Sequence, residues 1–338
     1  MTTVSCVFWN VHNLYPYLPN KTPTKTENWW PASPAEYAQK VSAVVAVLRG
    51  MPGGTPDLMA FCEVACPKKV AGLDAVGDVA KALGPAFAHY TGVEGDQRGI
   101  TCAVVWNTGR LTEDSSARRL VAVQDDVTGG AYGRPILQVE FGASGSPQPF
   151  TLLVNHWTSR REENTEGRRM LAGYHLVRLV QSKVVKGGGY TGDPKALVVA
   201  VGDFNDEPYD KSLVDPSGRS GRALVSRDRT AVLRRRPATV APVLYNAGWR
   251  LLGERQTRSE EVASGKEKPA GTYLFGEIGE GQWSTFDQVL VSAGMLEGPV
   301  PVFDERALEV YCPPQLVGPD GQADMTSDHF PIRFALNF

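Results

Sequence analysis

The sequence contains no long hydrophobic run and few cysteines. Its longest apolar stretches fall far short of the roughly 20 residues that a membrane-spanning helix needs, so we expect no stable membrane association. The opening residues lack the basic region and small-residue cleavage site of a secretory signal. These absences predict a cytoplasmic location. The cysteines are odd in number and not spaced like metal ligands, which favours reduced structural thiols: Cys6, Cys62, Cys66, Cys102 and Cys312.

The sequence also lacks a large excess of charge of either sign. Its 35 basic and 37 acidic residues give a formal net charge of −2, so the whole molecule does not attract nucleic acid electrostatically. The charge is uneven, however, because the segment 219–236 contains a single acid, Asp228. Two interpretations of this segment stay open, a solvated surface and a patch that faces phosphate groups. Its arginines are Arg219, Arg222, Arg227, Arg229, Arg234, Arg235 and Arg236.

No proline-, glycine- or serine-rich linker divides the chain, and no internal repeat is visible. Apolar runs typical of strands occur at both ends, so we expect the termini to share one core. We therefore predict a single domain over residues 1–338, although the length alone suggests two. The pattern predicts an α/β fold of mixed sheets with helices outside. The predicted strands are 4–10, 57–63, 100–106, 136–141, 150–155, 196–202, 286–292 and 331–336.

Three helices are predicted between these strands. The first begins with Ser33 as its N-cap, Pro34 in its first position and Glu36 completing a capping box. The second is expected over 68–83, and the third runs from near Asn164 to a stop at three glycines. Long loops often carry the residues that contact a substrate. We expect such loops at 16–33, 107–134, 214–242 and 255–271.

Polar residues recur at the edges of the predicted strands. Taken one at a time, each has an ordinary interpretation: a lone asparagine usually caps a turn, and a lone histidine is usually a satisfied structural residue. Their recurrence at six strand edges favours one shared site. Carboxylate, amide and imidazole groups suit a hard divalent cation and phosphate. The residues are Asn10, Glu63, Asn155, His156, Asp203, Asn205, Asp287, Asp328 and His329.

A series of motifs strengthens this interpretation. In order along the chain they are FWNVHNLY, DLMAFCEV, RGITCAVVW, GRPILQVEF, VNHWTSR, GDFNDEP, FDQVLVS and TSDHFP. The series resembles that of the endonuclease/exonuclease/phosphatase superfamily. These metal-dependent phosphoesterases include deoxyribonucleases, abasic-site endonucleases, sphingomyelinases and inositol-polyphosphate phosphatases. The match spans residues 4 to 336, and the VNHWTSR element is similar to a bacterial nuclease-like branch. The resemblance implies a four-layer sandwich of two packed mixed β-sheets flanked by helices.

The resemblance also implies a role for each polar residue. Glu63 would be the principal ligand of Mg²⁺, or of Mn²⁺ in its place, with Asn10 and Asp328 close to the metal. Such an ion offsets the charge that builds on phosphate oxygens in the transition state. Asp203 and Asn205 would orient the attacking water and the phosphate.

Two histidines would complete the catalytic set. His329 would be the general base or a phosphate contact, and Asp287 would fix its tautomer. His156 would donate a hydrogen bond to a phosphate oxygen. The residues expected to bind substrate are Arg134, Asn155, Tyr273 and Trp283, the last two as aromatic faces for a base or sugar. The alternatives are an ordinary loop arginine for Arg134 and core packing for both aromatic residues, above all Trp283.

The leading hypothesis is a Mg²⁺-dependent phosphodiesterase that acts on nucleic acid as a nuclease. A phosphoesterase for a small molecule or a phospholipid headgroup is the alternative, in which the Trp29–Trp30 pair would touch a membrane or gate a pocket. An unusual reaction on a metabolite at the same metal site is a further option. A non-catalytic binding module is disfavoured because the site residues are all present. The sequence indicates no protein partner.

Overall fold

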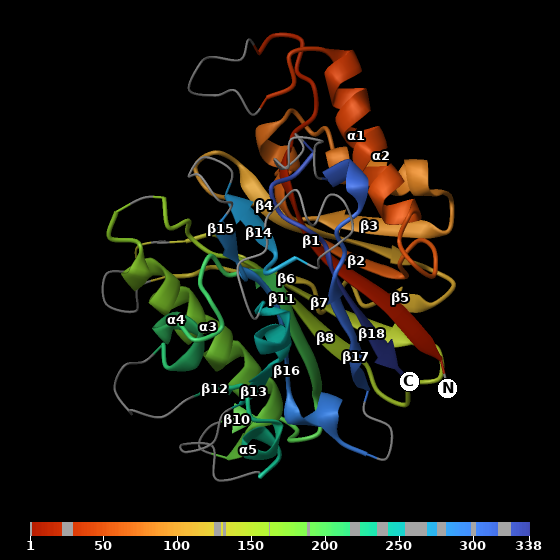
Figure 1. Ribbon diagram of the computed structural model, residues 1–338. Coiled ribbons are helices and arrows are strands. Elements are labelled where there is room, and N and C mark those ends of the chain that lie inside the picture. The colour runs from red at the N-terminus through yellow and green to blue at the C-terminus, as the bar shows by residue number, and fades with distance from the viewer. Residues whose placement is uncertain are drawn as a thin grey trace.

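Two large mixed β-sheets dominate the computed structural model (Figure 1). The structure describes residues 2–21, 30–124, 130, 133–161, 163–187, 190–216, 224–234, 243–253, 269–275, 282–298, 302–316 and 326–338.

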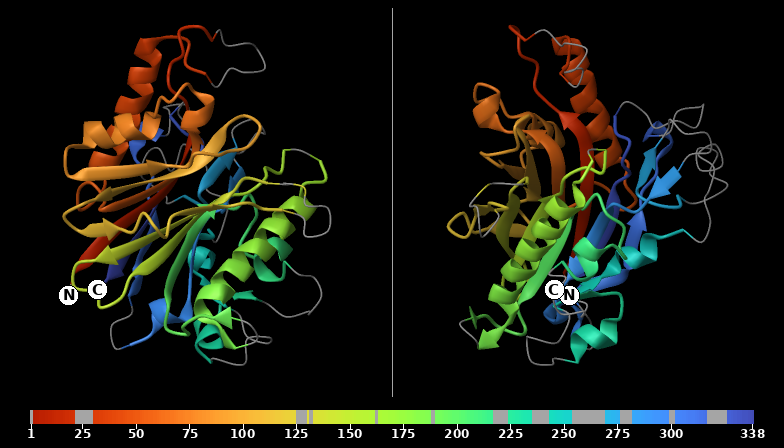
Figure 2. Two further views of the ribbon diagram at one scale, coloured as in Figure 1. Left: turned by 180° about the vertical axis from the view of Figure 1, so that it is seen from behind. Right: turned by 90° about the vertical axis from the view of Figure 1, so that its left-hand side faces the viewer.

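The first sheet contains both ends of the chain. β1 runs parallel to β2 and antiparallel to β18, and Thr2 N donates to Phe338 O at 2.7 Å, so the termini lie side by side (Figures 1 and 2). This is the shared core expected from the strands at both termini; the extent of one domain over 1–338 stays a prediction. The strand order is β17 (Phe303–Val310), β18 (Ile332–Asn337), β1 (Thr3–Leu14), β2 (Leu58–Ala65), β4 (Ile100–Asn107) and β3 (Phe87–Thr91).

The second sheet is built around a parallel pair, β8 and β11, with antiparallel neighbours on both sides. Its order is β12 (Val225–Ser226), β13 (Leu244–Asn246), β16 (Asp287–Val291), β11 (Leu197–Asp203), β8 (Phe150–His156), β7 (Ile136–Ala143) and β5 (Leu111–Glu113), with β6 (Arg119–Val121) also on β7. Two short pairs stand apart: β9 (Lys186–Gly187) with β10 (Tyr190–Thr191), and β14 (Tyr273–Phe275) with β15 (Gln282–Ser284).

Side chains from both sheets form one apolar layer between them, with Phe8 and Cys62 from the first sheet and Val139 and Val201 from the second. Helices cover the outer faces (Figure 2). α1 (Pro34–Arg49) and α2 (Ala75–Leu83) pack on the first sheet, and α3 (Glu166–Val184) packs on the second. The result is the predicted four-layer sandwich. Short helices complete it: η1 (Pro67–Lys69), α4 (Lys211–Val214), α5 (Arg229–Leu233), η2 (Ala247–Leu251), η3 (Ala293–Leu296) and η4 (Pro314–Leu316).

All eight predicted strands are present, and α1 and α3 confirm two of the predicted helices. At α1, Ser33 Oγ accepts from Glu36 N at 3.1 Å, while Glu36 Oε2 accepts from Ala32 N at 2.7 Å instead of closing the box on Ser33. The third helix was predicted to stop at the three glycines 187–189, and α3 ends at Val184. Positions 188 and 189 lie outside the described residues.

Two expectations were wrong in extent. The helix predicted over 68–83 begins only at Ala75, because Ala71 and Gly72 adopt left-handed φ values of +55° and +81° that end the preceding turn. The segment 107–134 is not one loop, because β5 and β6 pair with β7 inside it. Similarly, β12 and α5 occupy part of 214–242, and most of 255–271 lies outside the described residues.

The cysteines are all unpaired, in agreement with the prediction of reduced thiols. Among the described residues, no helix has both the length and the apolar character needed to cross a membrane.

Candidate active site

Polar side chains from both sheets meet at one edge of the sandwich. Within the second sheet, Asp203 lies opposite His156 on β8 and opposite Asp287 on β16, so these three residues occupy neighbouring strands at the same level. In the first sheet, Asn10 lies beside Cys62, the residue before Glu63. The ends of these strands therefore lie together and bring the predicted residues to one place.

Two of the site residues have a left-handed backbone. Glu63 has a φ of +58° at an irregularity in β2, between Phe61 and Val64, and Asn205 has a φ of +50°. This conformation costs roughly 1–2 kcal/mol for a residue with a side chain. A bulge turns a side chain away from the regular alternation of a strand, and such strain gathers at functional sites. Local contacts hold both residues in this conformation.

The contacts around Asn205 come from an ionic network centred on the buried carboxylate of Asp206. Asn205 N donates to Asp203 Oδ1 at 2.9 Å, and its carbonyl accepts from Arg160 Nε at 2.8 Å. Arg160 and Arg169 both donate to Asp206 Oδ1, at 2.7 and 2.8 Å. Asp206 therefore ties the GDFND loop to α3, which carries Arg169.

Glu63 and Asp203 direct carboxylate oxygens toward a common point. Asn10 Nδ2 donates to Glu63 Oε1 at 3.2 Å and to Asp203 Oδ2 at 2.9 Å. His156 Nε2 is 3.7 Å from each of the same two oxygens. Burial raises the pKa of Asp203 to about 7, with a smaller opposing effect from His329. Two converging carboxylates, one of them buried and hard to ionise alone, fit a divalent cation with a preference for oxygen ligands.

Asn10 was expected near a metal ion, and the structure places it between the two carboxylates. Its amide oxygen accepts from His12 N at 3.0 Å, which leaves the NH₂ group facing Glu63 and Asp203. In this arrangement Asn10 is a hydrogen-bond donor to the carboxylates, because the oxygen that would bind a metal is directed elsewhere.

Asp287 holds the imidazole of His329. His329 Nδ1 lies 2.8 Å from Asp287 Oδ2, and His329 Nε2 lies 3.7 Å from Asp203 Oδ2. Burial by itself would lower the pKa of His329, but the carboxylates of Asp287 and Asp203 raise it to about 10. The ring therefore carries a proton on both nitrogens and presents Nε2–H to the centre. This form suits contact with a phosphate oxygen better than proton abstraction.

His156 has the opposite charge state. Burial, followed by the positive charge of Arg134, lowers the pKa of His156 well below its ordinary value. Arg134 Nη1 lies 3.0 Å from His156 Nε2 and donates to Trp157 O at 2.8 Å, while Arg134 Nε donates to Asp96 Oδ2 at 3.0 Å. The neutral His156 thus accepts from Arg134 through Nε2, and its buried Nδ1 has no partner among the described residues. Donation from His156 to phosphate stays a prediction.

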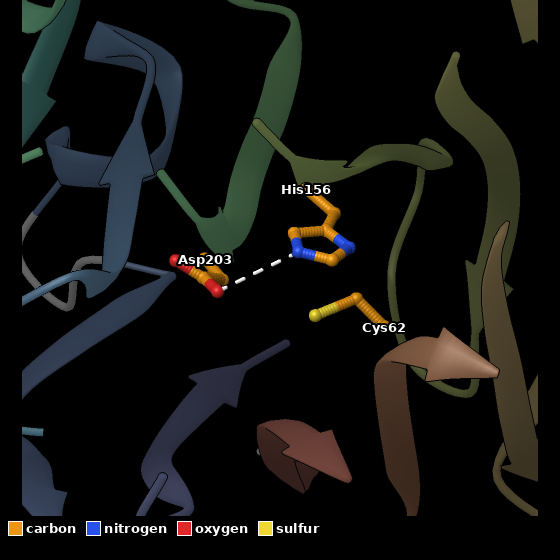
Figure 3. A group of neighbouring side chains, drawn as sticks. All are labelled: Cys62, His156 and Asp203. Carbon is orange, nitrogen blue, oxygen red and sulfur yellow. Dashed lines mark ion pairs between the residues drawn. The ribbon is translucent and has the colours of Figure 1, made fainter. Parts of the chain in front are cut away.

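Cys62 is a neighbour of this centre that the sequence did not single out. Figure 3 shows Cys62, His156 and Asp203 pointing toward one another from β2, β8 and β11, with ligand atoms that all lie within 4.8 Å. Burial raises the pKa of the Cys62 thiol well above its ordinary value. Since the thiolate is the form that binds metals, this trio is poorly suited to a soft ion such as Zn²⁺.

Asp328 lies on the side of the site nearer to solvent. Its Oδ1 is 2.7 Å from His12 Nδ1, and its Oδ2 is 3.8 Å from Arg161 Nη2, which also donates to the hydroxyl of Tyr273 at 3.0 Å. Burial would raise the pKa of Asp328, but the hydrogen bond with His12 and the charge of His329 lower it well below its ordinary value. His12 and Arg161 were not predicted, although they occur within or directly after the quoted motifs.

Of the four residues expected to bind substrate, two face the centre. Arg134 contacts His156, and the ring of Tyr273 is centred 4.6 Å from that of His329. The other two are buried away from the centre, and their contact with substrate stays a prediction. Asn155 is fully buried, with its amide bonded to Leu153 O, Val201 O and Trp157 Nε1. Trp283 is 5% exposed and packs in the core against Phe330, which is the alternative considered for it.

The remaining sequence features are resolved in part. Trp30 is buried against Tyr15, with ring centroids 4.4 Å apart, so it is not available to a membrane; Trp29 lies outside the described residues. In the arginine-rich segment, Arg227 lies over the ring of Trp249 and Arg229 pairs with Glu305 at 3.8 Å. The arginines at 219, 222, 235 and 236 also lie outside the described residues.

The fold is shared with several solved structures. TDP2 from D. rerio, crystallised with a single-strand DNA product, superimposes with a TM-score of 0.59 and 15% identity over 100% of both chains. The catalytic domain of human Nocturnin, with bound sulfate, gives a TM-score of 0.54 and 14% identity over 99% of this chain and 94% of that one. A Bacteroides vulgatus endonuclease/exonuclease/phosphatase gives 0.57 and 12% over 100% of both chains.

Sequence comparison identifies the family. No curated protein matches the chain. The model of the Endonuclease/Exonuclease/phosphatase family matches residues 5–235, which is more than half of the chain. The matched region includes Glu63, His156 and the Asp203–Asn205 loop. The chain therefore belongs to the endonuclease/exonuclease/phosphatase family and is a metal-dependent hydrolase of phosphoester bonds.

Proposed function

We propose that the chain is a Mg²⁺-dependent phosphodiesterase that acts as a nuclease on nucleic acid. The observation that carries this proposal is the convergence of the Glu63 and Asp203 oxygens beside the His329–Asp287 pair. Oxygen ligands suit Mg²⁺, and Mn²⁺ can take the same set. Glu63 is the proposed principal ligand, with Asp203 beside it, and Asp328 is a further candidate 4.0 Å from His329 Nε2.

In the proposed mechanism, the chain's own residues orient the reactants. A bound Mg²⁺ would offset the charge that develops on the phosphate oxygens. Asp203, whose pKa is raised to about 7, accepts a proton from the attacking water near neutral pH. His329, held by Asp287, donates a hydrogen bond from Nε2–H to a non-bridging phosphate oxygen and keeps its proton. Asn205 contacts the phosphate, and His156 and Arg134 supply polar groups on the opposite side of Asp203.

The choice of nucleic acid rests on two supports. TDP2, which has a similar fold, was crystallised with a single-strand DNA product. Tyr273 also places an aromatic ring next to His329; the residue is 8% exposed, so the contact proposed for a base or sugar is limited to this exposed part. The burial of Trp30 removes one reason for a lipid substrate. The unpaired thiols favour a reducing compartment, and we propose the cytoplasm.

The test measures turnover of supercoiled plasmid, single-stranded DNA, RNA and bis-p-nitrophenyl phosphate with Mg²⁺, Mn²⁺ or EDTA. We expect cleavage of a nucleic acid that EDTA abolishes and that Glu63→Gln and His329→Ala reduce by about 10²–10⁴-fold. Glu140→Gln, which alters a carboxylate paired with Lys183 on the outer helix side of β7, is the matched control and keeps full activity. Turnover of bis-p-nitrophenyl phosphate alone would contradict the nuclease assignment and favour a small-molecule or phospholipid substrate.

A further inference from the structure

An exposed cluster of aromatic and arginine side chains is not used by the site described above. Tyr209 is 57% exposed, which is unusual for a large side chain of this protein. Its ring is centred 6.0 Å from that of Trp249, and the guanidinium carbon of Arg227 lies 5.0 Å from the Trp249 ring centroid. Arg227 is exposed and Trp249 is half-buried. We call these three residues the aromatic platform.

The aromatic platform lies at the same edge of the second sheet as Asp203 and Asp287. β13 is antiparallel to β16, with Asn246 opposite Leu290, so the chain after β13 runs toward the end of β16 that begins at Asp287. Trp249 follows there, in η2. β12 is parallel to β13 and leaves the sheet at the same end (Figure 1), and Arg227, which follows β12, lies over the ring of Trp249. Tyr209 comes from the other side, directly after the GDFNDEP motif.

Buried hydrogen bonds join the aromatic platform to the catalytic loop. Asn246 Nδ2 donates to Gln288 Oε1 at 2.7 Å, and Gln288 Nε2 donates to Asp206 O at 2.7 Å. Gly248 N donates to Asn246 Oδ1 at 2.8 Å, and a Cβ on Gly248 would come within 2.8 Å of Gln288 Cγ. The glycine therefore lets η2 pack closely on β16. Trp249 is positioned by the same buried groups that support the loop of Asp203 and Asn205.

Further rings and a guanidinium fill the interval between the aromatic platform and His329. The ring of Tyr273 is stacked on that of Phe286, with centroids 5.4 Å apart. The guanidinium of Arg160 lies 5.2 Å from the Phe286 ring, and the same group pairs with Asp210, the neighbour of Tyr209. Tyr273 and Phe286 are each 8% exposed, so they act as buried support beside the site, and the accessible rings at this edge are those of Tyr209 and Trp249.

Accessible aromatic rings beside an exposed arginine, as in the aromatic platform, are the chemistry that binds a single strand of nucleic acid. Unpaired bases stack on aromatic faces irrespective of sequence, and arginines pair with the phosphates between them. Bases within a duplex are already stacked, so they do not use such faces. We propose that the aromatic platform stacks unpaired bases of a polynucleotide whose scissile phosphate lies at Glu63 and Asp203. The proposal rests on the nuclease function proposed above and adds a preference for single-stranded substrate.

Steady-state cleavage of a short fluorescent single-stranded DNA, its RNA counterpart and a blunt duplex, with Mg²⁺, tests this proposal. We expect Tyr209→Ala and Trp249→Ala each to raise KM for a single strand about 5–100-fold with a smaller change in kcat, since each removes a stacking face. Trp249→Phe should recover much of the loss, because it restores an aromatic face. Leu73→Ala, which alters another exposed apolar side chain on the α2 side of the molecule, is the matched control.

Turnover of bis-p-nitrophenyl phosphate separates a binding effect from damage to the fold. A lost stacking face lowers the ratio of oligonucleotide kcat/KM to bis-p-nitrophenyl phosphate kcat/KM, whereas misfolding lowers both in proportion. An unchanged ratio in both alanine variants, or an equal rise in KM for the blunt duplex, overturns the aromatic platform and leaves the nuclease function standing. A wild-type protein that hydrolyses bis-p-nitrophenyl phosphate and no polynucleotide overturns the nuclease function itself. If the variants raise KM more for DNA than for RNA, or the reverse, the more affected nucleic acid is the one that the aromatic platform binds. Either result supports the proposal.

Discussion

His329 Nδ1 and Asp287 Oδ2 lie 2.8 Å apart at the centre of the site, and Asp287 is also the residue directly opposite Asp203 across the β11–β16 pair. One carboxylate therefore fixes the proton on Nδ1 and contributes to the positive charge of the ring. The other oxygen of Asp287, Oδ1, is buried without a hydrogen-bond partner among the described residues. A buried carboxylate oxygen without a hydrogen-bond partner destabilises the fold unless its charge stabilises a neighbouring cation. The neighbouring cation is the ring of His329, so we infer that Asp287 is there to stabilise it.

Replacement of Asp287 by asparagine tests this relationship. The amide keeps the shape of the side chain, but it no longer raises the pKa of His329 by charge, and its NH₂ group favours the wrong tautomer. We expect kcat to fall about 10²–10³-fold, the range for a lost hydrogen-bond donor to the transition state, while the melting temperature changes little. Phosphodiesterase kinetics and thermal unfolding of Asp287→Asn and Glu140→Gln provide the measurement. Activity within a few fold of wild type would show that the His329–Asp287 pair is not catalytic.

The paired carboxylates predict a metal-dependent gain in stability. A ligand that binds only the folded state stabilises it by roughly 2.7 kcal/mol when its free concentration is a hundredfold above Kd. We expect Mg²⁺ to raise the melting temperature of the wild type, and Glu63→Gln to remove most of this rise because a neutral amide replaces the proposed ligand. Thermal unfolding across a Mg²⁺ titration, with EDTA as the reference, measures it. An undiminished rise in Glu63→Gln would place the ion elsewhere.

Asp74 predicts a pH dependence of stability outside the active site. Its carboxylate caps α2, accepts from Val76 N and Thr91 Oγ1 at 3.1 and 2.8 Å, and contacts His89 Nε2 at 3.1 Å. Burial would raise the pKa of Asp74, but these hydrogen bonds lower it below the ordinary value of 3.8. A carboxyl whose folded pKa is depressed stabilises the protein above its unfolded pKa, and this contribution is lost as the pH falls through the folded value.

Asp74→Asn should therefore lower the free energy of unfolding by about 0.3–1 kcal/mol at pH 7, because it removes the charge at the helix N-terminus, and by progressively less as the pH falls below about 4. Urea unfolding from pH 7 to pH 3.5 measures the difference between variant and wild type. Glu309→Gln, at a largely exposed carboxylate, is the control and should show little difference at any pH. A constant difference across this range would mean that the cap contributes no charge-dependent stability.

The strands and the shared site were predictable because both correspond to local patterns in the sequence. Continuous apolar runs mark strands that are covered on both faces, and polar residues such as Glu63 and Asp203 interrupt these runs where the strands end. Edge strands lack such continuous apolar runs and were therefore missed. β17, for example, alternates irregularly and carries several charged residues. Strands of that kind are recognised only by the neighbours with which they pair.

The direction of individual side chains was not predictable. Asn155 and Trp283 have the chemistry of substrate contacts, but their environment depends on residues distant in sequence, namely Val201 and Phe330. His12 was overlooked because nothing near it in the sequence indicates that it meets Asp328. The left-handed φ of Glu63 is likewise invisible in a strand-like run, although it determines where the carboxylate points.

A variant of Cys62 tests whether oxygen atoms or a thiolate bind the metal. Its thiol belongs to a trio with His156 and Asp203, but burial keeps it protonated, so we expect no role in metal binding. Cys62→Ala should keep the Mg²⁺ dependence of activity and lose about 1 kcal/mol of stability from the missing buried group. Cys102→Ala, at another fully buried thiol of the same core, is the matched control. If Cys62→Ala alone abolishes metal-dependent turnover while both variants stay folded, the site binds its metal through sulfur, and an ion softer than Mg²⁺ is required.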